Sequence, residues 1–315
     1  MTTAGPQAVA PSIRKVPLRK RIRRELRVRA LLFVLPLLSR LPHRIALALG
    51  GAAGWLAWIL VPRHRRAALE NLAIAFPERE RSWHAKTGRA SFVNLGRSAF
   101  EAFAQQRIDL ARAVHFEAGS LEALTAAHAE GRGVLAISCH LGNWEILART
   151  VAVHGFPLAT VAREAQDPRL TALLERARAS SGIVSLWRGT AGGARGFIRH
   201  LRKGGIVAAL IDQDTDVSGH FVPFFGREAF TPRAPADFAL RTGAAVLFVR
   251  TWRVAPGVHR ISASRLAVPD SGDLEADSLA LTAAATSAIE NEVRAHPDQW
   301  VWMHARWHTR RGTIR

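Results

Sequence analysis

Short apolar segments that alternate with helical segments most constrain the fold of this 315-residue chain. Four runs rich in Val, Ile, Leu and Ala have the length of buried strands, at residues 134–138, 157–162, 206–211 and 245–249. Segments with a helical spacing of apolar residues lie between them, at 144–153, 167–180, 195–202 and 234–242. This alternation favours a mostly parallel central sheet flanked by helices, so we predict an α/β fold.

Helical spacing also predicts helices at residues 65–76 and 81–104, before the alternating region, and at 280–295, after it. No long linker follows residue 66, so we treat residues 63–315 as one catalytic domain. The single cysteine, Cys139, excludes a disulfide framework and a multi-thiolate metal site. We predict that Cys139 is a small buried thiol, and we expect neither a metal nor a bound cofactor.

Positive charge concentrates in the first 66 residues, which contain 14 Lys and Arg but a single acid, Glu25. The whole chain has a net charge of +19. This balance suits an anionic membrane surface or an acidic partner, and the sequence lacks the common nucleic-acid-binding signatures. We expect residues 1–25 to be a disordered basic tail, and we expect no nucleic acid among the partners.

Residues 26–62 predict apolar helices that anchor the chain to a membrane. Residues 45–61 form 17 consecutive positions without a charge, which is near the lower limit for crossing a bilayer. Basic residues flank this stretch on both sides, which fits amphipathic or re-entrant helices in the cytoplasmic leaflet better than a single crossing. A buried helical hairpin in a soluble protein is the alternative.

The segment that follows residues 134–138 is the strongest candidate for a catalytic site. It places His140 and Glu145 where a buried strand ends and a helix begins, the position at which ligands gather in parallel α/β sheets. Gly142 permits a sharp turn, which would let the carboxylate reach the imidazole, fix its tautomer and make it a better base. We predict that His140 is a general base oriented by Glu145, a pair that suits direct acyl transfer to a hydroxyl.

Other catalytic arrangements fit the sequence less well. Cys139 and His140 are adjacent in an extended segment and would point to opposite faces, which argues against a Cys–His nucleophile. The chain contains neither the G-x-S-x-G turn of serine hydrolases nor the H-E-x-x-H motif of zinc proteases.

Four motifs, in order along the chain, resemble the late acyltransferases of lipid A biosynthesis. The first is N-L-A-I-A-F-P-E at residues 71–78, and the second is the H-x4-E pair of His140 and Glu145. The third is D-Q at 212–213 with F-F-G at 224–226 and Thr231, and the fourth is W-V-W-M-H-A-R-W at 300–307. The resemblance extends from about residue 63 to residue 307.

The resemblance implies a glycerolipid-acyltransferase-like domain in which His140 and Glu145 are the catalytic pair. It also implies a functional arginine at Arg178, which would hold a lipid phosphate or the developing oxyanion. The corresponding functional aspartate is Asp212, which would orient Arg178 or a backbone turn. Arg163, at the end of the second predicted strand, is a weaker candidate for substrate binding.

The activity implied by the resemblance is transfer of a fatty acyl chain from an acyl carrier protein thioester to a hydroxyl of a lipid A precursor. The enzyme would lie at the inner membrane, with its catalytic domain on the cytoplasmic side. A basic body would dock the acidic carrier protein, and the basic anchor suits an anionic lipid acceptor. The residues Phe221, Phe224, Phe225 and Phe230 would either line part of an acyl groove or belong to the ordinary core.

Two alternative functions remain at this point. One is an acyltransferase that acts on another membrane glycolipid or phospholipid, for example a mannosylated phosphatidylinositol. The other is a non-catalytic, membrane-bound scaffold that binds acidic partners through its basic N-terminus.

Overall fold

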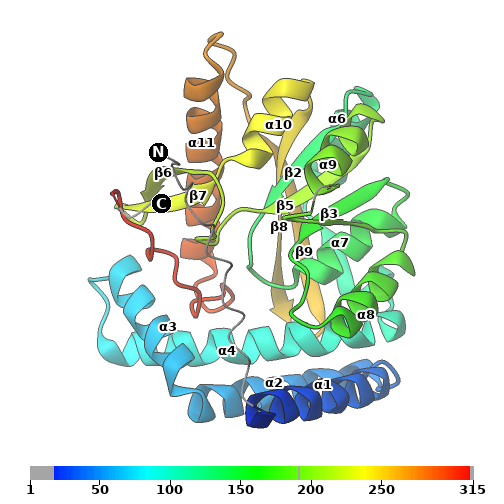
Figure 1. Cartoon of the computed structure of the whole chain (residues 1–315), viewed down its shortest axis with the longest axis vertical. Helices are drawn as coiled ribbons and strands as arrows, with labels where there is room; N and C mark the ends of the chain where they lie inside the picture. The colour runs from blue at the N-terminus through cyan, green and yellow to red at the C-terminus, as the bar shows by residue number, and fades with distance from the viewer. Residues whose placement is uncertain (1–17, 191, 313–315) are drawn as a thin grey trace, which may run out of the picture.

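A seven-stranded sheet forms the centre of the molecule in the computed structural model, which describes residues 18–190 and 192–312 (Figure 1). Across the sheet, the strands are β1 (Val114–Phe116), β9 (Val258–Arg265), β8 (Ala245–Ala255), β2 (Val134–Ser138), β5 (Ile206–Leu210), β3 (Leu158–Ala162) and β4 (Val184–Trp187). All neighbouring strands are parallel except β8 and β9. The predicted α/β fold with a mostly parallel sheet is therefore confirmed.

Helices cover both faces of this sheet. The helices on one face are α6 (Ser120–Ala129) and α7 (Trp144–Val153), and those on the other are α9 (Gly193–Arg202), α10 (Ala234–Thr242) and α11 (Leu274–Ala295). The helix α8 (Pro168–Ala179) contacts the edge strand β4, while α5 (Leu110–Ala113) and the 3₁₀ turn Gln105–Arg107 precede β1. A separate hairpin of β6 (Gly219–Phe224) and β7 (Arg227–Pro232) contacts α11.

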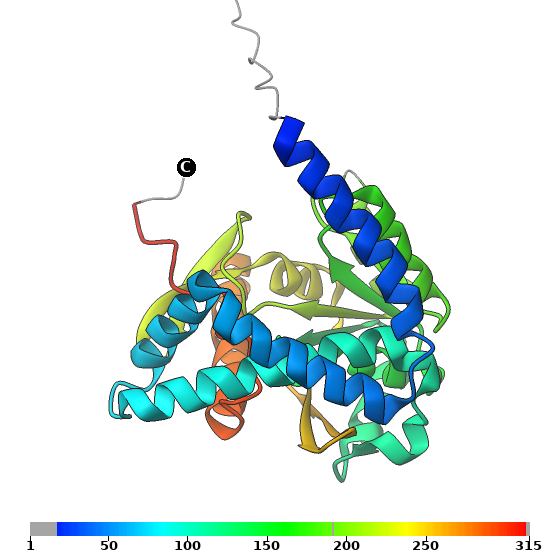
Figure 2. The ribbon, with the colours of Figure 1, turned by 90° about the horizontal axis from the view of Figure 1, so that it is seen from below.

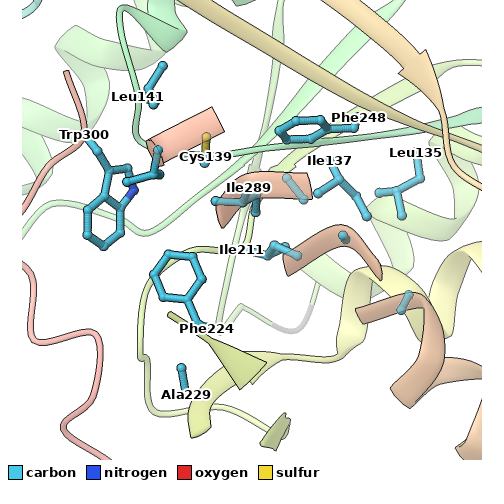
Figure 3. Close-up of a cluster of buried hydrophobic side chains, with 14 of the residues drawn as sticks. Leu135, Ile137, Cys139, Leu141, Ile211, Phe224, Ala229, Phe248, Ile289 and Trp300 are labelled. Atoms are coloured by element: carbon cyan, nitrogen blue, oxygen red, sulfur yellow. The ribbon is translucent and has the colours of Figure 1, made fainter. Parts of the chain in front are cut away.

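Alternation along the strands creates a separate core on each face of the sheet. In β2, Val134 and Ala136 pack towards α6 and α7, whereas Leu135 and Ile137 pack towards α9, α10 and α11. The second cluster continues through Cys139 to the hairpin and the C-terminal segment (Figure 3). All five residues of β2 are buried, because helices cover both sides of this strand.

Four N-terminal helices form a layer across one end of the sheet, where α2 and α4 run side by side while α1 leaves at an angle and passes over α8 (Figures 1 and 2). They are α1 (Leu18–Leu38), α2 (His43–Leu60), α3 (Pro62–Ala75) and α4 (Arg81–Ala104). Glycines allow α2 to approach α4 closely, because a Cβ at Gly54 would lie 2.1 Å from the carbonyl oxygen of Phe92. The helix α2 is thus an integral part of the packed domain.

The other side of the N-terminal layer is apolar and exposed. Within the described residues, α2 is the one helix that is long and apolar enough to cross a bilayer, and a third of that stretch is buried against the protein. The large exposed apolar side chains of α1 and α2 are Ile22, Leu26, Phe33, Val34, Leu37, Ile45, Leu49, Trp55, Leu56, Ile59 and Leu60. We call these residues the apolar face.

Some elements differ from the sequence prediction. The described part of α1 begins at Leu18, so this helix extends into the segment for which we expected a disordered tail, and residues 1–17 lie outside the described residues. The sequence pattern did not predict α6, the strands β1, β4 and β9, or the hairpin of β6 and β7. The missed strands of the sheet are at or next to its edges, where polar residues interrupt the apolar runs that identify central strands.

Candidate active site

A tight turn joins β2 to α7 and presents His140 at the carboxyl end of the central strand. Gly142 has φ of +64°, and a Cβ there would lie 2.2 Å from the carbonyl oxygen of Thr251, so only glycine fits this turn. Asn143 then caps α7, because its side chain accepts a hydrogen bond from the backbone N–H of Ile146. The local sequence therefore fixes where the strand ends and where the helix begins.

His140 is held by Asp212, which follows the neighbouring strand β5. The two side chains meet at 2.8 Å between His140 Nδ1 and Asp212 Oδ1, and the backbone N–H of His140 donates to Asp212 Oδ2 at 2.7 Å. Trp300 Nε1 donates to the same Oδ2 at 2.7 Å. Burial opposes ionisation of this carboxyl, but the charge and hydrogen bonds of His140 and the bond from Trp300 outweigh it and lower the pKa of Asp212 to about 2.

The predicted contact between His140 and Glu145 is wrong in this structure. Glu145 lies in the first turn of α7 and forms an ion pair with Arg178 of α8, with 2.5 Å between Arg178 Nη2 and Glu145 Oε1. The reason is the strand order: because β5 is adjacent to β2, Asp212 reaches the imidazole, while Glu145 has already entered the helix. Of the two roles predicted for Asp212, orienting Arg178 is wrong, because Glu145 binds that arginine, whereas holding a backbone turn is confirmed by the hydrogen bond that Asp212 accepts from the N–H of His140.

Gln213 connects His140 to a second histidine. Its Nε2 atom lies 3.1 Å from His140 Nε2 and 2.9 Å from His304 Nε2. An amide nitrogen has two hydrogens, so it donates to both imidazoles when each carries its own proton on Nδ1. Burial, with a smaller contribution from the charge of His140, lowers the pKa of His304 to about 4. His304 is therefore neutral at pH 7. A proton on His140 Nδ1, facing Asp212, leaves the lone pair of the neutral imidazole on Nε2.

The sequence analysis did not select Gln213, His304 or Trp300 as site residues, although it quoted the motifs that contain them. The signal was available, because the motifs D-Q and W-x-W-x-H supply polar side chains without an assigned role. What the sequence did not show is that the C-terminal segment lies against the catalytic turn. Val301 donates a backbone hydrogen bond to His140, and Leu141 pairs with Trp300.

The C-terminal segment is itself held in place by the other two motifs. Asn71 Nδ2 donates to the carbonyl oxygens of Trp302 and His304 at 2.7 and 2.5 Å. Arg306 is fully buried and donates to the carbonyl of Phe230 and to Thr231 Oγ1 at 2.6 and 2.7 Å. All four motifs therefore meet in one network around His140.

A cavity of about 240 Å³ opens beside His140, on the side of the sheet covered by α6 and α7. His140, Arg163, Arg178 and Gln213 line it near the carboxyl ends of the strands, whereas Leu158 and Ile206 lie at the amino ends. Its apolar lining consists of Leu124, Ala136, Trp144, Leu147, Ala148, Val151, Leu158, Val161, Ala162, Ile206, Ala208, Leu210 and Val249. The cavity is thus polar beside the base and apolar further along the strands.

Among the described residues that line this cavity, none is one of the four phenylalanines considered for an acyl groove. Phe224, Phe225 and Phe230 are buried in the core, and Phe224 lies beside Trp300 on the opposite side of the sheet (Figure 3). Their interpretation as ordinary core is confirmed for these three. Cys139 is a free, buried thiol as predicted, and burial raises its pKa well above the usual value.

A network of buried charged side chains supports the catalytic turn on the side of α4. Glu101 of α4 is fully buried and binds Arg253 through both carboxylate oxygens, at 2.9 and 2.7 Å. The same carboxylate accepts a hydrogen bond from Asn143, the cap of α7, at 2.9 Å, and contacts His43 of α2 at 3.0 Å. Burial opposes ionisation of Glu101, but hydrogen bonds from Arg253, His259 and His43 and the charge of Arg253 outweigh it and lower the pKa of Glu101 far below the usual value. The network links the N-terminal layer to the turn that carries His140.

Comparison with known proteins agrees with this geometry. A model of the family described as "Bacterial lipid A biosynthesis acyltransferase" matches residues 18–309. The chain is 28% identical over 281 residues to the lipid A biosynthesis palmitoleoyltransferase of Escherichia coli strain K12, covering 88% of this chain and 89% of the relative. It is 26% identical over 279 residues to the lauroyltransferase of the same organism, covering 88% and 90%.

A phosphatidylinositol mannoside acyltransferase of Mycobacterium tuberculosis strain H37Rv is also similar, with 28% identity over 225 residues and 69% of each chain covered. The relatives all have names of acyltransferases, and the family match covers most of the described chain, including the four motifs that meet at His140. The chain therefore belongs to the bacterial lipid A biosynthesis acyltransferase family and is an acyltransferase.

Proposed function

We propose that this enzyme transfers a fatty acyl chain from a thioester donor to a hydroxyl of a lipid A precursor at the inner membrane, on its cytoplasmic side. The observation that carries the proposal is the His140–Asp212 pair at the polar end of an apolar cavity. The greater coverage by the lipid A relatives favours this acceptor over a mannosylated phosphatidylinositol.

In the proposed mechanism, His140 acts as general base. Asp212 holds the Nδ1–H, so that Nε2 accepts the proton of the acceptor hydroxyl, which attacks the thioester carbonyl. Gln213 occupies that face of the imidazole in the free enzyme, and the acceptor hydroxyl replaces its hydrogen bond. The protonated imidazole then returns its proton to the departing thiolate.

Arg178 is the group best placed to stabilise the oxyanion. Its Nε and Nη2 atoms bind Glu145, whereas its buried Nη1 has no hydrogen-bond partner among the described residues, 18–190 and 192–312. Because the side chain also lines the cavity, this nitrogen is available to a negatively charged oxygen on the reacting carbonyl. The role of Glu145 is then to hold the guanidinium in position.

Transfer is proposed to be direct, without an acyl-enzyme. Alternation along β2 directs Cys139 into the opposite core and leaves Ser138 and His140 on the cavity side. The high pKa of the Cys139 thiol makes it a poor nucleophile. We infer that an acidic acyl carrier protein presents the donor, because residues 67–315, with 30 Lys and Arg against 24 Asp and Glu, keep a net charge of +6 that provides electrostatic complementarity.

The apolar face of α1 and α2 supports association with the membrane. Because one side of α2 packs on α4, we propose that these helices lie in the plane of one leaflet, with the apolar face in the lipid. The 14 Lys and Arg among the first 66 residues would then contact anionic headgroups.

Mass spectrometry of lipid A tests the proposed reaction in cells that contain the wild-type protein, carry His140→Ala, or lack the gene. We expect loss of one acyl mass in both defective strains, and the size of that loss identifies the transferred chain. His308→Ala is the matched control, because His308 is exposed and lies outside the network. An unchanged lipid A profile with an altered phosphoglycolipid would contradict the acceptor, and full activity of His140→Ala would contradict the mechanism.

A further inference from the structure

Two arginines at the mouth of the cavity have no role in the mechanism described above. Arg163 follows β3 and Arg188 follows β4, and both line the cavity together with His140. Ala162 and Trp187 are register partners in these parallel strands, and the backbone N–H of Arg188 donates to Ala162 at 2.8 Å. The two arginines therefore leave the same edge of the sheet side by side.

Neither arginine forms an ion pair with a described residue. Arg178, the third arginine that lines the cavity, forms an ion pair with Glu145. Within the described residues, no carboxylate pairs with Arg163 or Arg188. Arg188 Nη1 donates to the neutral Thr215 Oγ1 at 3.2 Å, and burial together with the charge of Arg163 lowers the pKa of Arg188. Two adjacent uncompensated cations are unfavourable without an anion between them.

The position of this pair relates it to the substrates. Thr215 is two residues beyond Gln213, which contacts His140, so the hydrogen bond to Thr215 holds Arg188 on the reactive side of the cavity. Guanidinium groups match the geometry of phosphate oxygens and bind them through paired, charge-assisted hydrogen bonds. Two guanidinium groups that follow neighbouring strands would bind one phosphate from two sides.

We propose that Arg163 and Arg188 form a binding site for a substrate phosphate at the mouth of the cavity. This inference rests on the proposed function, because both substrates of that reaction supply such a group. The phosphate belongs either to the pantetheine arm of the thioester donor or to the acceptor lipid. In either case the site fixes one substrate at its charged end while its reactive atom lies near His140.

The first arm of the test measures binding of the donor without turnover. Full-length protein in detergent micelles is titrated with two non-reactive thioethers of the same alkyl length, S-alkyl phosphopantetheine and S-alkyl pantetheine. If the donor supplies the phosphate, the wild type binds the phosphorylated compound roughly tenfold more tightly. Arg163→Gln with Arg188→Gln then reduces this ratio to about one, while Arg202→Gln, which removes an exposed arginine of α9, preserves it.

The second arm measures the acceptor. If the acceptor supplies the phosphate, the double variant raises KM for a phosphorylated acceptor relative to its dephosphorylated form, with kcat changed less, and the donor ratio stays at its wild-type value. Arg163→Gln alone and Arg188→Lys guard against misfolding, because Arg163 is exposed and the lysine keeps the charge. Unfolding temperatures of all variants are measured alongside.

The proposal is overturned if the double variant is folded but keeps two wild-type values. These are the ratio of the affinities for the phosphorylated and unphosphorylated thioethers, and the ratio of the KM values for the phosphorylated and dephosphorylated acceptors. Failure of the proposed function gives a different result. The wild type would then acylate no lipid acceptor, while its binding of the two thioethers could still be measured. His140→Ala separates the two properties, because it abolishes turnover and retains the phosphate-dependent ratio of the thioethers.

Discussion

At the scale of single residues, the partner of His140 determines which carboxylate controls the base. Asp212 contacts Nδ1 at 2.8 Å, whereas Glu145 binds Arg178. Asp212→Asn replaces an ionised acceptor with an amide that can favour the wrong imidazole tautomer, so we expect kcat to fall by about 10²-fold or more, with a small change in the donor KM. Steady-state kinetics of the purified variant measure this.

Glu145→Gln is the matched comparison for that experiment. The substitution weakens the ion pair with Arg178 but leaves the His140–Asp212 pair intact. The pH dependence of kcat/KM that results from the general base should therefore be the same as in the wild type. The opposite pattern, an active Asp212→Asn and an inactive Glu145→Gln with altered pH dependence, would restore the His140–Glu145 pair predicted from the sequence.

His304 makes stability depend on pH. Burial lowers its pKa from 6.5 to about 4, so the unfolded chain binds the proton first as the pH falls. The stability that depends on neutral His304 is complete above pH 6.5 and is lost between pH 6.5 and 4. Asp212, whose pKa is lowered from 3.8 to about 2, adds a loss between pH 4 and 2.

We expect His304→Asn to reduce the loss of stability between pH 6.5 and 4. Chemical denaturation in micelles at pH 7 and pH 5 measures the difference, which should be smaller in the variant than in the wild type. Because burial also lowers the pKa of His259 and His220, the substitution removes only part of the dependence. If the free energy of unfolding changed equally between pH 7 and pH 5 in the variant and the wild type, His304 would not contribute to the pH dependence of stability.

At the scale of elements, the close packing of α2 on α4 depends on individual glycines. A Cβ at Gly54 would lie 2.1 Å from the carbonyl oxygen of Phe92, whereas a Cβ at Gly51 would meet only the flexible side chain of Arg97, at 3.1 Å. Gly54→Ala forces the helices apart, and we expect it to destabilise the protein by about 1–3 kcal/mol. Gly51→Ala should be neutral or stabilise by up to about 1 kcal/mol, because alanine favours helix.

Unfolding of both variants in micelles measures this difference, and equal stabilities would show that α2 and α4 are not in close contact. The pair is well matched because the same substitution is made in one helix, one turn apart. It also bears on the catalytic turn, since His43 of α2 contacts Glu101, which binds the cap of α7.

The order of the strands explains which parts of the site the sequence could predict. The apolar run of β2 and the glycine after His140 located the catalytic turn, because both signals are local. The pairing of His140 with Asp212 depends on β5 lying next to β2, and nothing local to either strand specifies that order. For the same reason Arg163 and Arg188 could not be recognised as neighbours, since β4 was missed as a strand.

At the scale of the whole molecule, we expect the N-terminal layer to have two separable roles, which are packing on the domain through α4 and the proposed association with the membrane. The helix α1 rests on α4 and α8, with Arg169 bound to Glu25 through two bonds of 3.0 and 2.7 Å, whereas α2 is packed into the domain. The sequence alone suggested an anchor attached to an independent catalytic domain beginning at residue 63. The structure instead makes α2 part of the surface that covers α4.

Two truncations therefore have different expected outcomes. Removal of residues 1–41 deletes α1 and 10 of the 14 basic residues of the N-terminal segment but retains α2, so the protein should fold and acylate a detergent-dispersed acceptor. Its binding to vesicles of anionic lipid should weaken, and the remaining binding should depend less on salt. Removal of residues 1–62 also uncovers the face of α4 that packs on α2, and this form should aggregate.

Vesicle flotation at low and high salt, size-exclusion chromatography and the acylation assay distinguish these outcomes. If the shorter protein were as monodisperse and as active as the longer one, α2 would be a dispensable anchor rather than part of the fold. If removal of residues 1–41 left binding to anionic vesicles unchanged, the apolar face of α2 would hold the enzyme at the membrane without help from the basic helix.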